Sequence, residues 1–174
     1  MTVATLAQLC VLAACLATAA AWDLSRRRIP NVVNLFTAVL GLVAALATGS
    51  LSAIGQGLAG GALVFALLAF AWRQRWIGGG DVKLGAAIGI WLGPVSGLYA
   101  LCVGVALSGI LAVVLLVRGG AAFRTEVKAN LVMAAYTGRV GDTTHRPESA
   151  HIPLGAALAA SALVIFLLRG SIGA

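Results

Sequence analysis

The chain has 174 residues, of which 61% are hydrophobic and only 10% are charged. A soluble domain has roughly 25% charged residues, so this composition excludes an ordinary soluble protein and predicts one embedded in a bilayer. The formal net charge is +7. The basic residues stand in short links between apolar runs, where they indicate anionic lipid headgroups rather than nucleic acid as partners.

Six apolar stretches are candidates for membrane-spanning helices, because about 20 apolar residues cross about 30 Å of hydrocarbon. The fourth of them is the shortest, and Gly85, Gly89 and Gly93 recur along it at every fourth position, which favours close helix packing or a broken segment. We therefore predict an all-α, polytopic membrane protein that forms a single domain over residues 1–174. The six stretches are Val3–Trp22, Val32–Thr48, Leu51–Trp72, Val82–Val95, Ser96–Val117 and Ile152–Leu168.

The charges around the first stretch predict the orientation of the chain. No charged residue precedes it, whereas Asp23 and Arg26–Arg28 follow it. A secretory signal carries its basic residues before the apolar run, so this stretch is predicted to be an uncleaved span with its N-terminus outside. Six spans from that start place both termini outside and every basic residue except Arg169 on the cytoplasmic side.

Two acidic residues, Asp23 and Asp81, adjoin apolar runs, whereas the other acids fall in a polar link. An ionisable residue beside a membrane span costs a few kcal/mol, so its default interpretation is functional. The predicted topology places both acids at inner ends of spans and therefore at the same depth. Two carboxyl groups a few ångströms apart cannot both ionise cheaply, so one keeps its proton while the other can take a proton from water. Such a pair is the minimum set for hydrolysing a peptide bond without a metal or a covalent nucleophile.

Structural interpretations of the same acids remain open at this point. Asp81 is placed to cap the N-terminus of the fourth span, where an acid meets the helix dipole. Asp23 is placed to form an interfacial ion pair with Arg26 or Arg27. Lys83, two residues after Asp81, either orients the acid pair or extends to the lipid headgroups.

Residues around the two acids are predicted to support the site. Gly78, Gly79 and Gly80 precede Asp81 and have no Cβ, so they can adopt unusual dihedral angles and let an extended substrate approach closely. Pro30 predicts a turn into the second span, since proline suits a helix start. Together with Lys83, these four residues are the predicted substrate-binding or supporting residues.

The sequence predicts neither a metal nor a cofactor. Cys10, Cys15 and Cys102 stand singly inside apolar runs, with no C-x-x-C pair. His145 and His151 lie in the long link after the fifth span without nearby cysteines, which makes a poor metal site. The same link, 118–151, has apolar residues spaced for a helix along the headgroups.

Two stretches together resemble the type IV prepilin peptidase family, polytopic aspartic proteases with a G-x-G-D motif. Asp23–Asn31, which reads DLSRRRIPN, matches that family's aspartate with its downstream Ile-Pro. Gly78–Gly85, which reads GGGDVKLG, matches the G-x-G-D-x-K-L signature. The G-x-G-D motif alone is shared with presenilin-like and signal-peptide-peptidase-like proteins, so the two stretches are specific only in combination.

The resemblance implies that Asp23 and Asp81 are a catalytic pair that cleaves basic leaders from prepilins or pseudopilins at the cytoplasmic face of the inner membrane. It also implies cleavage after a glycine that precedes an apolar helix. Larger members of the family carry an N-terminal extension with C-x-x-C pairs and methylate the new N-terminus with S-adenosylmethionine. This chain starts directly in its first span, so it resembles the short form associated with tight-adherence or Flp-type pili, without methyl transfer.

Two other classes of function compete with the peptidase hypothesis. A small proton-coupled transporter would use the two acids as relay sites, but it would place them near the middle of the membrane, often with inverted repeats. A non-catalytic pilus-assembly subunit would use them only for capping and pairing. Cleavage assays on variants of the two acids distinguish these classes.

Overall fold

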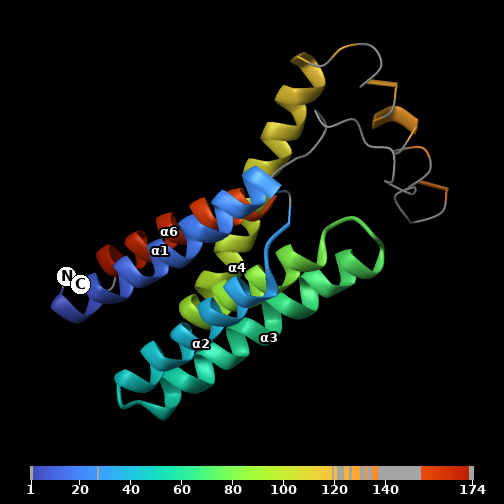
Figure 1. Cartoon of the computed structure of the whole chain (residues 1–174). Coiled ribbons are helices and arrows are strands. Elements are labelled where there is room, and N and C mark those ends of the chain that lie inside the picture. Colours follow the sequence, from blue (N-terminus) through green and yellow to red (C-terminus); the bar gives the residue numbers. More distant parts are fainter. Residues whose placement is uncertain are drawn as a thin grey trace.

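A computed structural model describes residues 2–26, 28–118, 120, 124–125, 127–129, 132, 135–136 and 154–172, and in this part of the chain every regular element is a helix (Figure 1). The predicted all-α class is therefore confirmed. The start of the predicted last span, both histidines and most of the link that was expected to hold a surface helix lie outside the described residues. The helices are α1 (Val3–Arg26), α2 (Asn31–Ala47), α3 (Leu51–Arg73), α4 (Gly79–Arg118) and α6 (Leu154–Ile172).

Three of these helices, α1, α3 and α4, are long and apolar enough to cross a membrane, and α2 and α6 are shorter apolar helices. The protein is thus a membrane protein, as its composition predicts. The fourth and fifth predicted spans lie in α4, an element of 40 residues in which two helices meet at a break near their predicted boundary.

The break inside α4 lies at Gly93, which has φ 76° and ψ 179° and is followed by Pro94. Left-handed φ is accessible to glycine, and proline removes a helix hydrogen bond, so the two residues together end one helical arm and begin another. A Cβ built on Gly97 would lie 3.2 Å from Gly89 Cα, although eight residues of straight helix span about 12 Å. The chain therefore folds back on itself between a first arm, 79–92, and a second arm, 94–118.

Glycines allow the first arm of α4 to pack directly on the backbone of α3. A Cβ on Gly57 would lie 2.9 Å from Ile90 O, and one on Gly60 would lie 2.5 Å from Gly93 C. A Cβ on Gly89 would in turn overlap the backbone of Gly60. These contacts confirm the prediction that the repeated glycines of this segment serve close packing.

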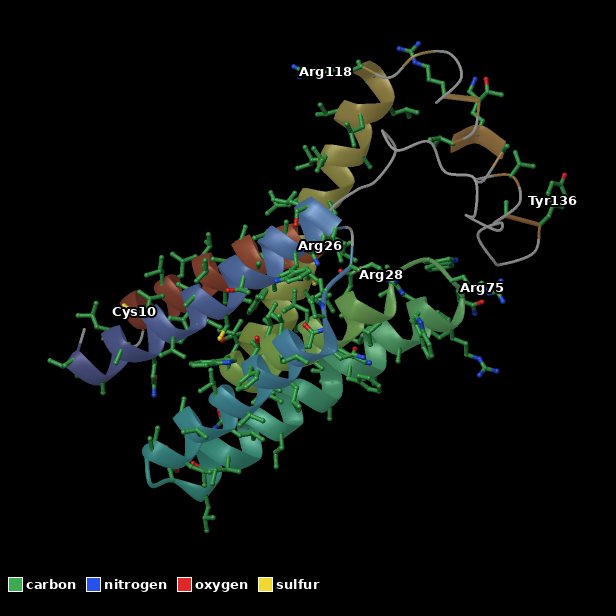
Figure 2. The ribbon with its side chains drawn as sticks, viewed as in Figure 1. Cys10, Arg26, Arg28, Arg75, Arg118 and Tyr136 are labelled. Carbon is green, nitrogen blue, oxygen red and sulfur yellow. The ribbon has the colours of Figure 1, made fainter. Side chains whose placement is uncertain are left out.

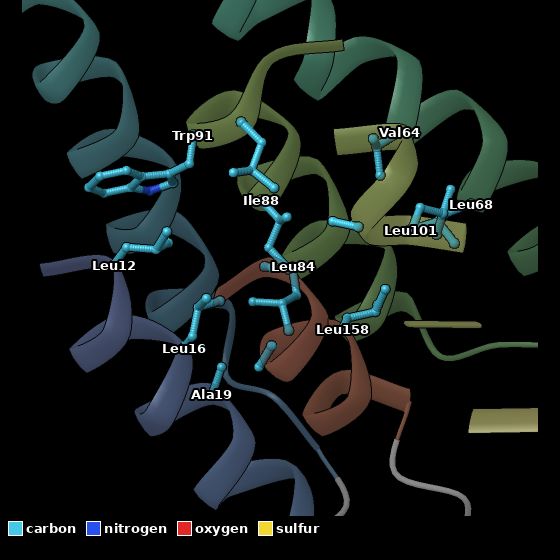
Figure 3. Close-up of a cluster of buried hydrophobic side chains, with 14 of the residues drawn as sticks. Leu12, Leu16, Ala19, Val64, Leu68, Leu84, Ile88, Trp91, Leu101 and Leu158 are labelled. Atoms are coloured by element: carbon cyan, nitrogen blue, oxygen red, sulfur yellow. The ribbon is translucent and has the colours of Figure 1, made fainter. Parts of the chain in front are cut away.

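Buried aliphatic side chains from α1, α3, α4 and α6 converge around the first arm of α4 (Figure 3). Leu12 and Leu16 come from α1, Val64 from α3 and Leu158 from α6. α6 lies beside α1 (Figure 1), and Ser161 Oγ ties α6 to the second arm of α4 by donating to Ala100 O at 2.8 Å. This packing brings the first turn of α6 to the end of α1, where the candidate site lies.

Candidate active site

Asp23 lies in the last turns of α1, and its side chain is only 4% exposed. The backbone N–H of Ala156, in the first turn of α6, donates a hydrogen bond to Asp23 Oδ2 at 3.1 Å. The first N–H groups of a helix have no partner within the helix, and they favour a negative group. The start of α6 therefore holds the Asp23 carboxyl in place. Arg26, one predicted ion-pair partner, lies with its guanidinium 4.1 Å from the centre of the Trp22 ring.

Asp81 lies in the first turn of α4 rather than at its cap, because the helix begins at Gly79. The predicted interaction with the helix dipole therefore applies to this acid. The two acids are distant in the sequence but close in the fold, because oxygens of both carboxyl groups lie near Gly155.

Gly155 lies close to both carboxyl groups. A Cβ built on this glycine would lie 2.9 Å from Asp23 Oδ2, 3.1 Å from Asp81 Oδ1 and 2.7 Å from Ile29 Cδ1. Since Asp23 Oδ2 and Asp81 Oδ1 are both measured from this same Cβ position, the distance between them cannot exceed the sum of 2.9 Å and 3.1 Å, about 6 Å. Sequence reasoning noted Gly155 only as part of the stretch 152–155 at the start of the last span and assigned it no role in the site. The available signal was a glycine in the first turn of a helix after Pro153, and that pattern is too common to single it out.

Two asparagines of α2 hold the turn that carries Asp81. Asn31 Oδ1 accepts a hydrogen bond from Lys83 Nζ at 2.8 Å, and Asn34 Nδ2 donates to Gly80 O at 3.1 Å. The segment is therefore fixed on both sides of Asp81. Sequence reasoning missed this role of Asn31 and Asn34, because their partners are far away in the sequence.

The predicted supporting residues lie near the two acids. None of Gly78, Gly79 and Gly80 has a positive φ, so the left-handed conformation that glycine permits is not used there. The left-handed residue of this segment is instead Arg75, with φ 62°. It follows the end of α3, where one such residue often terminates a helix. Pro30 precedes the first residue of α2, with φ −61°, as expected for a turn into that helix.

Both acids and every predicted supporting residue line one polar cavity of about 820 Å³. Arginines gather around it, as Figure 2 shows for Arg26, Arg28 and Arg75. Among the described residues, no group of three His, Cys, Asp or Glu side chains forms a possible metal site. The residues lining the cavity are Trp22, Asp23, Arg26, Arg28, Ile29, Pro30, Asn31, Arg75, Trp76, Ile77, Gly78, Gly79, Gly80, Asp81 and Lys83.

An apolar helical fold with two carboxyl groups facing one polar cavity defines an all-α membrane protein with a potential acid–base pair. Residues 10–117 match the model of the type IV leader peptidase family, and this segment includes Asp23 and Asp81. The match covers more than half of the chain, so the protein belongs to that family. Its membership indicates a leader-peptidase-like protease with a prepilin-type substrate. Comparison with curated proteins and with solved structures found no significant match.

Proposed function

We propose that this protein is an aspartic endopeptidase in which Asp23 and Asp81 remove the basic leader of a prepilin or pseudopilin. The observation that carries the proposal is that both carboxyl groups flank Gly155 in one polar cavity, with their nearest oxygens within about 6 Å. A water molecule that hydrogen-bonds to two carboxyl groups, at about 2.7 Å from each, bridges a gap of about 5 Å. The upper limit of about 6 Å on the separation of the two oxygens includes this gap, which supports a water held by the pair as the nucleophile.

In the proposed reaction the two carboxyl groups of Asp23 and Asp81 share one proton, so one is ionised and the other is protonated. The ionised carboxylate takes a proton from the water as its oxygen bonds to the scissile carbonyl carbon, and the protonated carboxyl donates a hydrogen bond to the carbonyl oxygen. When the C–N bond breaks, the leaving amine takes a proton and the acid pair returns to its starting state. Cleavage needs one ionised and one protonated acid, so its dependence on pH should be bell-shaped, with both limbs belonging to the pair.

We further propose that cleavage takes place at the cytoplasmic face of the inner membrane and that anionic headgroups surround this end of the protein. Arg26, Arg28 and Arg75 lie at the end of the helices that carries the acids (Figure 2). An excess of basic residues marks the cytoplasmic side of a membrane protein. Both acids lie at helix ends, which supports a peptidase over a transporter with acids at mid-membrane.

The test is cleavage of a prepilin-like protein by the purified chain in lipid vesicles, compared with Asp23→Asn and Asp81→Asn. Each amide variant keeps the shape of the side chain and removes its acid–base function, so cleavage should fall by at least about 10³-fold. Cys102→Ser is a suitable control, because Cys102 is exposed and does not line the cavity. Full cleavage by either amide variant would refute the proposal. A wild-type protein that binds the substrate without cleaving it would support a non-catalytic subunit.

A further inference from the structure

A second cavity, of about 400 Å³, adjoins the active-site cavity, and six of its nine lining residues are apolar. We name it the lateral groove. Asn31 and Lys83 line both cavities, so the two cavities meet at this pair of residues. Its residues come from α2, α3 and the first arm of α4, and they are Asn31, Asn34, Leu35, Ala38, Phe65, Lys83, Ala86, Ala87 and Ile90.

We propose that the lateral groove binds the apolar helix of the substrate, the part that follows the cleaved bond. This inference rests on the proposed function and extends it to a docking surface. The adjacency of the two cavities, which share Asn31 and Lys83, supports it, because a chain whose scissile bond lies at Asp81 must continue into an adjoining space. A polar cavity next to an apolar groove matches a polar leader that is joined to an apolar helix.

The shape of the lateral groove suits a helix. Ala38, Ala86 and Ala87 extend no further than Cβ, and small residues let two helix backbones approach closely in a membrane. Leu35 and Phe65 are 64% and 49% exposed, so much of each side chain is free to contact a docked helix. The groove thus has small side chains along its length and two large apolar side chains, one from α2 and one from α3.

The inner end of the lateral groove contains an unused hydrogen-bond acceptor. Asn34 is 3% exposed, and its Oδ1 has no hydrogen-bond partner among the described residues, although its Nδ2 is bound to Gly80 O. A buried unpaired acceptor costs about 1–3 kcal/mol. The first N–H groups of a helix are unpaired donors and need partners inside a membrane. A substrate helix that begins at this end of the groove brings such donors close to Asn34.

Photo-crosslinking tests the docking surface directly. A photo-reactive phenylalanine analogue is placed at Leu35 or Phe65, in an Asp81→Asn background that retains the substrate. Control positions are Val113 and Val105, which are similarly exposed, at 60% and 50%, and lie on the second arm of α4 outside the groove. The probe is a prepilin-like protein with a basic leader, a glycine and an apolar helix of about 20 residues.

We expect crosslinks from Leu35 and Phe65 to the apolar helix of the probe, at least about tenfold more than from the two controls. Equal crosslinking from all four positions, or none from the groove, while the wild-type protein cleaves the probe, would overturn the groove and leave the proposed function intact. If the wild-type protein does not cleave the probe, both proposals fail.

A kinetic variant provides an independent measurement. Ala86→Phe places a ring in the lateral groove without touching the acid pair, so KM for the probe should rise about tenfold while kcat changes less than threefold. Val105→Phe adds a similar ring on the lipid-exposed second arm and should leave both constants unchanged. An unchanged KM for a folded Ala86→Phe variant would contradict helix docking in the groove.

Discussion

Replacing Gly155 with alanine should impair catalysis without unfolding the protein. The added methyl group would lie 2.9 Å from Asp23 Oδ2 and 3.1 Å from Asp81 Oδ1, where ordinary contact begins at 3.4 Å. Each carboxyl group must therefore move by a few tenths of an ångström, and Ile29 Cδ1, at 2.7 Å, must move further. Catalytic groups need placement within about 0.5 Å, and an error of 1 Å costs on the order of 10²-fold in rate.

We therefore expect Gly155→Ala to lower kcat by about 10-fold to 100-fold, which is roughly 1.4–2.7 kcal/mol of transition-state stabilisation. The greater helix propensity of alanine, worth about 1 kcal/mol, partly offsets the contacts of the new methyl group. The melting temperature should consequently change by only a few degrees. The loss should appear in single-turnover cleavage at saturating substrate, because the change affects the acid pair rather than substrate binding.

Gly109→Ala is the matched control for this experiment. Gly109 lies within α4, and a Cβ built on it meets nothing within 4 Å. This variant gains the same helix propensity and should cleave at the wild-type rate. A wild-type kcat for Gly155→Ala would refute the close contact of Gly155 with the two acids. If Gly155→Ala lost activity only because it unfolded, this would contradict the expectation that the helix propensity of alanine partly offsets the contacts of the new methyl group.

Two further substitutions test the packing and the positioning of the site. Gly60→Ala places a methyl group 2.5 Å from a backbone carbon of Gly93, and backbone cannot move aside as a side chain does. The melting temperature should therefore be at least about 5 °C lower than that of the control Gly55→Ala, whose Cβ meets nothing within 4 Å. Equal melting temperatures would contradict the close contact of α3 with α4. Asn34→Ala removes the hydrogen bond to the turn before Asp81 together with the unpaired Oδ1. Cleavage should therefore fall about fivefold to tenfold while the melting temperature stays within about 2 °C, and a loss of stability without a loss of rate would assign Asn34 a structural role only.

Charge placement along the sequence was one basis for predicting that the two acids form a pair. Asp23 and Asp81 each follow or precede an apolar run at a basic end, and topology alone brings such positions to one depth. The break near Gly93 was also visible, since glycine followed by proline interrupts a helix. The sequence therefore predicted the two helical arms of α4, whereas the close approach of Gly97 to Gly89 depends on three-dimensional packing.

The remaining parts of the site depend on contacts between distant residues. Gly155 is important because the start of α6 packs against the end of α1, and a lone glycine gives no sign of that partner. Asn34 reads in the sequence as a polar residue in an apolar helix, and its bond to Gly80 crosses 46 positions. The glycines before Asp81 show a further limit of sequence analysis, since a glycine indicates which backbone conformations are allowed and not which one the chain adopts.

The hydrogen bond between α6 and the first acid also depends on the order of synthesis. Asp23 and Asp81 leave the ribosome long before Ala156, whose amide reaches back across 133 positions to Asp23. A partly synthesised chain therefore contains both acids but lacks the amide that holds Asp23. This contact forms only after the start of α6 has been made.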